Sequence, residues 1–274
     1  MPFLESLIAH RNAEKALLAA NFYNAETLLA ILRAAKVTNS EVIVQTSPST
    51  LDYLGVSLAV SMVRSAAREQ GVTAWLHLDH ATDTELIHQC IRMGYDSVMI
   101  DASEKDFDTN IKLTRQIVTS AHQAGIAVEA ELGCVPKLGQ ADINEAGLTV
   151  PEEAKKFVEE TGIDLLAVAI GTAHGFYKKK PKLDLDRLAA IHKLVEVPLV
   201  LHGGSGLTPE QWQETIQRGV AKINFATEIK DTFIRAIKQS VLQTDEIDLR
   251  KIFPAGIKAA TQLVAAKMHV CKMV

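Results

Sequence analysis

Three histidines follow short apolar runs that lie far apart in the sequence: His80, His174 and His202. Neutral imidazole is a favoured nitrogen ligand of Zn²⁺, and three protein ligands with an open position are typical of a catalytic zinc site. A single histidine near the end of a strand is more often only hydrogen-bonded, so the prediction depends on all three residues meeting. If the fold brings them together, the sequence predicts a zinc centre with room for a substrate.

Acidic side chains accompany these histidines. Asp79 directly precedes His80. It can be a metal ligand, the hydrogen-bond partner of a histidine or a general base, and the spacing leaves these three roles open. Asp101 and Glu131 end two further apolar runs. Glu129 alternates onto the same strand face as Glu131, and we interpret it as one half of an ion pair inside the fold.

Two segments near the last apolar runs indicate an anion site. Gly203–Gly206 (GGSG) follows one run, and Asn224–Thr227 (NFAT) ends the other. Glycines let backbone N–H groups approach an anion closely, and helix N-termini favour negative charge. Lys178, four residues after His174, can add a positive charge, although a solvated loop explains Lys178–Lys180 equally well. The candidate anion-binding residues are therefore Gly203, Gly204, Ser205, Asn224, Phe225, Ala226 and Thr227.

Eight apolar or β-branched runs must position these side chains, and each run ends in polar residues or glycine. They are Ala19–Phe22, Glu41–Ser47, Thr73–His80, Ser97–Ser103, Ala127–Gly133, Leu165–Thr172, Pro198–Ser205 and Ala221–Glu228. Segments with apolar residues at i, i+3 and i+4, such as Ala25–Ala35 and Phe107–Ala124, lie between them and predict helices. Thr208, directly before Pro209, and Thr149, two residues before Pro151, predict capped helix starts.

This alternation of eight strands with helices predicts an α/β fold, a single (β/α)8 or TIM barrel that spans residues 1–274. A doubly wound open sheet is the alternative, but it typically has a glycine-rich first turn, which this sequence lacks. In a TIM barrel, catalytic groups come from the C-terminal ends of the strands, and phosphate binds after strands seven and eight. The polar run ends then meet at one rim, and Ser47 joins the candidate binding residues there.

Composition excludes several classes of protein. The chain has 29 Lys and Arg against 33 Asp and Glu, a net charge of −4, so a basic nucleic-acid surface is not expected. The three cysteines form no CxxC pair, which disfavours a disulfide framework or a thiolate zinc site. The sequence shows no signal-peptide pattern and no long uncharged apolar run, so we expect a cytoplasmic protein without a membrane span.

Six stretches, in family order, resemble the class II, zinc-dependent ketose-bisphosphate aldolases. They are HLDHATD, SVMIDAS, VEAELG, AVAIGTAHGFYK, PLVLHGGSG and KINFATE, and the resemblance runs from Asn21 to the C-terminal DLRKIFPAGIKAA. That family includes the fructose- and tagatose-1,6-bisphosphate enzymes. The resemblance implies reversible cleavage of a phosphorylated ketose to dihydroxyacetone phosphate and an aldehyde.

Carried over to this sequence, the resemblance implies that Asp79 transfers the proton and that His80, His174 and His202 bind the catalytic zinc. Two acids match residues that hold a second or displaced metal position in some members: Asp101 and Glu131. The positions that hold dihydroxyacetone phosphate, often with Na⁺ or K⁺ nearby, match Gly175, Lys178, Gly203, Gly204, Ser205, Asn224 and Thr227. The family also implies that the protein forms a homodimer or homotetramer. It further implies that the bound partner is a small phosphorylated sugar.

One loop departs from the family pattern. After ELG, the family often has a glycine pair and acids that supply a proton, whereas this chain has Pro136 and Lys137, with Asp142 and Glu145 out of register. The sequence therefore leaves open which aldehyde the cleavage releases. Two other functions are also considered: a non-catalytic, aldolase-derived binding subunit of a sugar-phosphate enzyme complex, and a metal-dependent hydrolase. The hydrolase usually needs an H-x-H pair on an early strand, which this sequence lacks.

Overall fold

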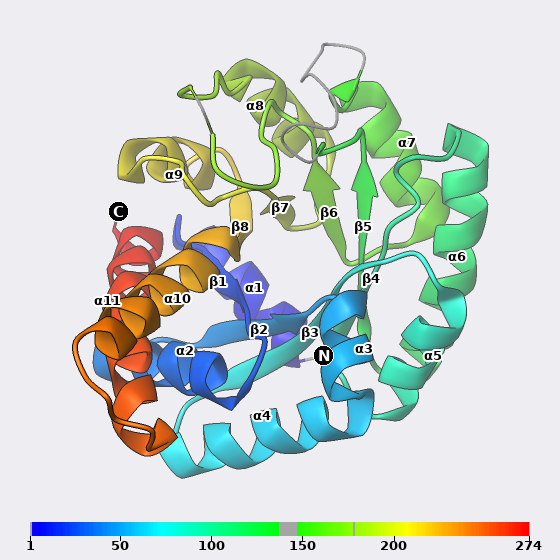
Figure 1. Cartoon of the computed structure of the whole chain (residues 1–274). Helices are drawn as coiled ribbons and strands as arrows, with labels where there is room; N and C mark the ends of the chain where they lie inside the picture. The colour runs from blue at the N-terminus through cyan, green and yellow to red at the C-terminus, as the bar shows by residue number, and fades with distance from the viewer. Residues whose placement is uncertain (1, 137–146, 178, 274) are drawn as a thin grey trace.

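The computed structural model describes residues 2–136, 147–177 and 179–273. Eight parallel strands pair in chain order and close into a barrel, with helices around it (Figure 1). The strands are β1 (Leu17–Asn21), β2 (Val42–Thr46), β3 (Ala74–Ala81), β4 (Ser97–Ile100), β5 (Ala127–Leu132), β6 (Leu165–Val168), β7 (Leu199–Leu201) and β8 (Val220–Phe225). The predicted (β/α)8 barrel is confirmed.

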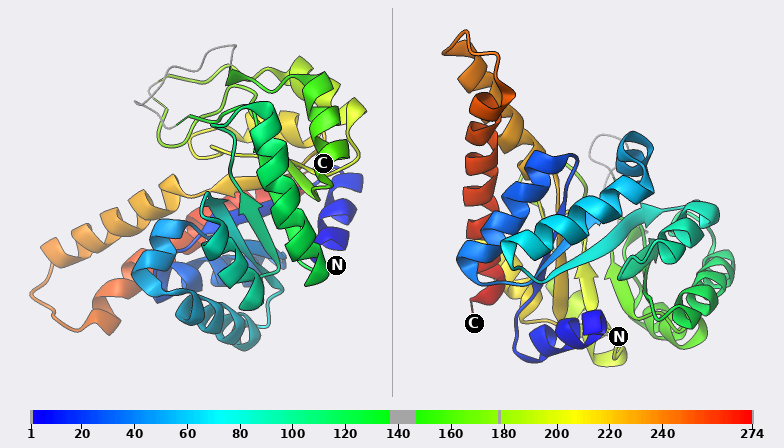
Figure 2. Two further views of the ribbon diagram at one scale, coloured as in Figure 1. Left: turned by 90° about the vertical axis from the view of Figure 1, so that its right-hand side faces the viewer. Right: turned by 90° about the horizontal axis from the view of Figure 1, so that it is seen from below.

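The helices lie between the strands and at both ends of the chain. They are α1 (Pro2–Asn12), α2 (Ala25–Thr38), α3 (Pro48–Leu54), α4 (Val56–Gln70), α5 (Thr84–Arg92), α6 (Phe107–Gln123), α7 (Pro151–Thr161), α8 (Leu185–Leu194), α9 (Pro209–Ile216), α10 (Thr227–Leu242) and α11 (Leu249–Lys272). Figure 2 shows α10 and α11 extending side by side beyond the barrel, and α11 packs along α2. Within the described ranges, every helix is too short or too polar to span a lipid bilayer.

Every predicted run overlaps one strand, but several strands are shorter than their runs. Pro198–Ser205 contributes only the three residues of β7, and Leu165–Thr172 contributes only the four residues of β6. The hydrogen-bonded pairing of β6 and β7 ends early because the backbone turns soon after each strand. Gly171 and Gly203 have φ angles of 103° and 70°. This left-handed region favours glycine. The polar residues after these strands therefore lie in loops at the rim.

The two predicted helix caps have different outcomes. Thr208 caps α9, and its side chain accepts a hydrogen bond from the backbone N–H of Gln211 in a capping box, as predicted. Thr149 does not cap α7, because Val150 occupies the N-cap position. The buried Thr149 hydroxyl instead donates to the backbone carbonyl of Leu132 and accepts from the N–H of Ala169. It therefore joins the ends of β5 and β6.

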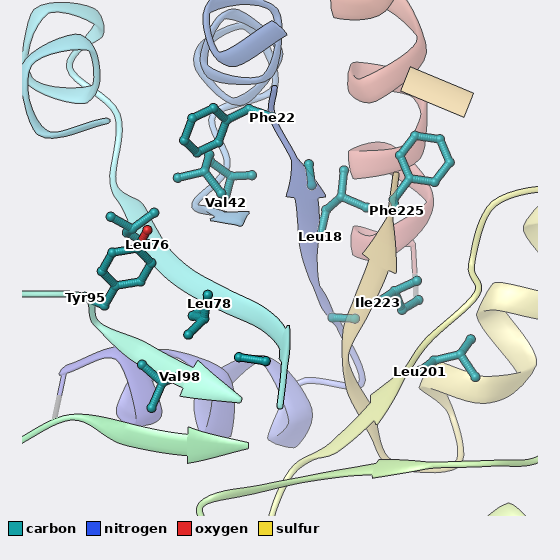
Figure 3. Close-up of a cluster of buried hydrophobic side chains, with 14 of the residues drawn as sticks. Leu18, Phe22, Val42, Leu76, Leu78, Tyr95, Val98, Leu201, Ile223 and Phe225 are labelled. Atoms are coloured by element: carbon teal, nitrogen blue, oxygen red, sulfur yellow. The ribbon is translucent and has the colours of Figure 1, made fainter. Parts of the chain in front are cut away.

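Apolar side chains fill two regions. Inside the lower barrel, Leu17, Ile43 and Val200 pack with Phe3 and Leu7 of α1, which closes the N-terminal end of the strands. The larger cluster lies between the barrel and its helices, where alternate strand residues point outward (Figure 3). The upper interior is thus left to the polar and charged side chains of the same strands.

Phe225 belongs to this outer cluster, so its side chain points away from the predicted anion site. Its side chain is fully buried, and its ring centroid lies 5.8 Å from that of Trp212. Figure 3 shows it directed toward α11. Because side chains alternate along a strand, Asn224 faces the interior while Phe225 faces the helices.

Phe225→Ala is expected to lower the free energy of unfolding by about 3–5 kcal/mol, because it opens a cavity beside Trp212. Urea unfolding measures this loss. Ile234→Ala on α10, where the side chain is 46% exposed, is the control and should change stability by about 0.5 kcal/mol or less. Unchanged stability of Phe225→Ala together with lost anion binding would contradict the outward placement.

Candidate active site

Three histidine rings converge at the C-terminal rim of the barrel. The ring centroid of His80 lies 4.7 Å from that of His174 and 4.4 Å from that of His202. His80 Nε2 and His202 Nδ1 are 2.6 Å apart. One ring nitrogen from each of the three residues lies within 4.8 Å of the others. The structure thus brings together three residues from three separate strand ends, as the sequence predicts.

The position of His80 requires an unusual backbone. His80 lies in β3 with φ of 51°, a left-handed conformation that is uncommon for residues other than glycine. The pairing of β3 with β4 is irregular between Leu78 and Ala81, so the strand is locally distorted at this residue. Such strain typically occurs at functional sites, where the surrounding structure imposes it. Here the strained backbone lies at the residue whose ring points toward His174 and His202.

Carboxylates fix the orientation of two of the rings. Asp101 Oδ2 lies 2.6 Å from His80 Nδ1, and Glu129 Oε1 lies 2.9 Å from His202 Nε2. A histidine that donates one N–H to a carboxylate presents the lone pair of its other nitrogen to a cation. Nε2 of His80 and Nδ1 of His202 are therefore the nitrogens that face the centre.

Glu129 is the central member of a buried charged network inside the barrel. Lys222 donates to Glu129 Oε2 over 2.8 Å, and both side chains are fully buried. His77 Nε2 lies 3.7 Å from the same oxygen. The predicted ion pair of Glu129 is thus present, with Lys222 as its partner. Lys222 is consequently engaged by a carboxylate rather than directed at the rim as a free amine.

Asp79 is held by two amides, one on each carboxylate oxygen. Asn21 Nδ2 donates to Oδ2 over 3.1 Å, and Asn224 Nδ2 donates to Oδ1 over 2.9 Å. Gln45 in turn donates to Asn21 Oδ1 over 2.8 Å. Asn21 and Gln45 fall within the first two predicted runs, and the sequence alone gives them no role. The structure shows that they orient Asp79.

Asp79 is ionised at neutral pH. Burial alone would raise the pKa of Asp79, but its electrostatic interactions with His80, His202 and Lys222 outweigh burial, so the pKa lies below its usual value. The hydrogen bond from Asn21 acts in the same direction. A fixed, ionised carboxylate beside three histidines can accept a proton from a bound molecule.

The electrostatics of the centre favour a cation. Burial lowers the pKa of His80, but Asp79, Asp101 and Glu131 overcome it and raise the pKa to about 9. Burial raises the pKa of Glu131 to about 8, and its Oε2 has no hydrogen-bond partner among the described residues. The acids that stabilise positive charge on His80 would also stabilise a divalent metal ion bound by the three imidazoles.

A second group of possible metal ligands shares His80. Ligand atoms of His80, Asp101 and Glu131 also lie within 4.8 Å of one another. Glu131 is buried, and its Oε2 lies 3.7 Å from Nδ1 of His202. The two acids that the resemblance associates with a second metal position therefore adjoin the three histidines.

A small cavity next to Asp79 joins this centre to the glycine-rich loop. It is lined by Asn21, Asp79, His174, Gly175, Gly203, Gly204, Ser205, Asn224, Ala226 and Thr227. A Cβ atom at Gly203 would lie 2.5 Å from the backbone oxygen of Ala173, so only glycine fits there. Helix α10 begins at Thr227 beside the same cavity, and its dipole favours an anion.

Two predicted binding residues, Ser47 and Phe225, are not among the described residues that line this cavity. Ser47 is the N-cap residue of α3, and its hydroxyl lies 3.0 Å from that of Ser49. Phe225 faces the outer helices instead. Lys178 lies outside the described residues, as do Lys137, Asp142 and Glu145 of the loop that departs from the family pattern.

Comparisons with known proteins agree with this geometry. The family model for class-II fructose-bisphosphate aldolase matches residues 3–274. The YdjI aldolase from Escherichia coli K12 is 33% identical, with a TM-score of 0.88 over 98% of this chain and 96% of that one. A protein from Coccidioides immitis, assigned as a fructose-1,6-biphosphate aldolase, is 34% identical, with a TM-score of 0.88 over 97% and 94%.

A more distant structure has the same fold. Fructose-bisphosphate aldolase from Campylobacter jejuni is 23% identical, with a TM-score of 0.85 over 97% of this chain and 93% of that one. The family match over nearly the whole length, together with the related aldolases, identifies the enzyme class as a carbon–carbon lyase. The chain belongs to the class-II fructose-bisphosphate aldolase family.

Proposed function

We propose that this enzyme uses Zn²⁺ to cleave a phosphorylated ketose reversibly into dihydroxyacetone phosphate and an aldehyde. The substrate is of the fructose- or tagatose-1,6-bisphosphate type, or a related ketose phosphate. The observation that carries the proposal is the ionised Asp79, fixed between Asn21 and Asn224 beside three converging histidines. The adjoining glycine-lined cavity supports a phosphate as the recognised group.

Each part of the site has a distinct task. Backbone N–H groups of the glycine loop and the N-terminus of α10 hold the phosphate of the substrate. A divalent cation held by His80, His174 and His202 would act as a Lewis acid on the ketone and its neighbouring hydroxyl. Asp79 accepts the proton from the adjacent carbon in the condensation direction and returns it after cleavage. Asn21 and Asn224 keep its carboxylate in place during both transfers.

Several finer features belong to the same proposal. A second cation position would use Asp101 and Glu131, and Na⁺ or K⁺ would accompany the phosphate. A homodimer or homotetramer and a cytoplasmic location remain predictions. The orientation of both Asp79 oxygens favours an enzyme over a non-catalytic binding subunit, because a binding role alone does not need a fixed base.

Asp79→Asn is expected to lower turnover about 100- to 10,000-fold while zinc binding is retained, because the amide keeps the shape but cannot accept the proton. Aldol cleavage rates and the zinc content of the purified variant measure the two effects. Asp83→Asn, which changes the N-cap residue of α5, is the control and should keep its activity. Near-normal turnover by Asp79→Asn would exclude Asp79 as the base.

A cleavage screen over phosphorylated ketoses, with and without a chelator, tests the substrate and the metal together. We expect the chelator to abolish cleavage of every active substrate and Zn²⁺ to restore it, because the histidines lose their cation. Borohydride added with substrate should trap no covalent adduct, since Lys222 is buried against Glu129. A borohydride adduct combined with chelator-resistant activity would instead demonstrate a Schiff-base mechanism.

A further inference from the structure

Tyr177 lies in the segment after β6, within the AHGFYK motif, and the function proposed above gives it no task. Its hydroxyl accepts a hydrogen bond from the backbone N–H of Ala173 over 2.8 Å and donates one to the backbone oxygen of Gly203 over 2.9 Å. A Cβ atom at Gly206 would lie 3.0 Å from Cδ2 of its ring, so the ring also packs on the glycine loop. Tyr177 thus contacts two loops of the site.

These two backbone groups are adjacent in sequence to two of the three converging histidines. Ala173 directly precedes His174, and Gly203 directly follows His202. The two loops also touch directly, because a Cβ atom at Gly203 would lie 2.5 Å from the oxygen of Ala173. A single side-chain hydroxyl therefore spans the contact between the segment that carries one histidine and the segment that carries another.

A tyrosine suits this position for a specific reason. A phenol hydroxyl can accept one hydrogen bond and donate another at the same time, and here the two partners are a backbone N–H and a carbonyl. Ala173 and Gly203 are buried, so both groups need partners inside the protein. Burial also raises the pKa of Tyr177 to about 12, so the hydroxyl keeps its proton at neutral pH. Phenylalanine would fill the space and make neither bond.

We propose that Tyr177 is a positioning residue that sets the separation of His174 and His202 and couples divalent-cation binding to the phosphate-binding glycines. The proposal deepens the function proposed above and rests on it. Loss of the hydroxyl frees the two loops to separate, so the histidine nitrogens no longer converge as closely. The same movement displaces Gly203 and Gly204, so both cation affinity and phosphate affinity fall together.

Tyr177→Phe tests this coupling without relying on turnover. The zinc Kd is measured in the absence of substrate by competition with a chromophoric chelator, and the site geometry is followed by the visible spectrum of the Co²⁺-substituted protein. We expect the zinc Kd to rise about 10-fold or more, as when groups around metal ligands are removed, and the Co²⁺ spectrum to change. The KM for the phosphorylated ketose should rise as well.

Tyr95→Phe is the control, because Tyr95 is buried and its hydroxyl lies 3.0 Å from Thr46 Oγ1, in the core outside the site. It should lower the melting temperature and leave the zinc Kd and the Co²⁺ spectrum unchanged. An equal rise in zinc Kd for both variants would reduce Tyr177 to a general structural role and overturn the inference.

The remaining outcomes separate the inference from the proposed function. Wild-type zinc Kd and Co²⁺ spectrum in Tyr177→Phe would overturn the inference and leave the proposed function intact. Failure of the wild-type protein to bind zinc would overturn the proposed function itself. If Tyr177→Phe does not fold, Gly206→Ala presses on the same ring and is expected to raise the zinc Kd. An unchanged Kd in that variant also overturns the inference.

Discussion

The active-site architecture depends on a carboxylate buried inside the barrel. Glu129 on β5 is fully buried, and it is compensated by Lys222 on β8 and by the N–H of His202 after β7. A buried charge that loses its partner costs several kcal/mol, so these three elements must keep their relative positions. This requirement fixes the tautomer of His202 and thereby the nitrogen that it offers to a cation.

The closed barrel also explains why the backbone at the rim is strained and crowded. His80 has a left-handed conformation within β3, and Gly203 contacts the oxygen of Ala173 without room for a side chain. Neither feature is favourable by itself, and the closed barrel around them holds both in place. A rigid barrel with short, crowded loops keeps the Asp79 carboxylate, the three histidines and the glycine-lined cavity at fixed distances, as the proposed proton transfer beside a bound phosphate requires.

Much of this arrangement is predictable from the sequence, because a barrel delivers its strand ends to one rim. That rule predicts that the three histidines and Asp79 meet at the rim. The segment NFAT contains both faces of a strand, and the alternation turns the side chain of Asn224 inward and that of Phe225 outward. Thr149 was assigned as a helix cap from its position before a proline, but its hydroxyl bonds to neighbouring strand ends instead.

Other features depend on register between strands and could not be predicted from spacing. The pairing of Asp101 with His80, and of Glu129 with Lys222 and His202, joins residues far apart in the chain. The bridge made by Tyr177 depends on the path of two loops after their strands have ended. The sequence supplies the candidate groups, whereas the distances between them come only from the closed barrel.

In the proposed mechanism, the carboxylate of Asp79 removes a proton from dihydroxyacetone phosphate, and a cation held by the three histidines would make that proton more acidic. The most direct measurement follows, by NMR in D₂O, the exchange of protons on the hydroxymethyl carbon of that compound with no aldehyde present. Zinc-loaded protein should catalyse the exchange, and protein stripped of metal should not until Zn²⁺ is returned. Equal exchange by loaded and stripped protein, or no exchange by the loaded protein, would contradict the account.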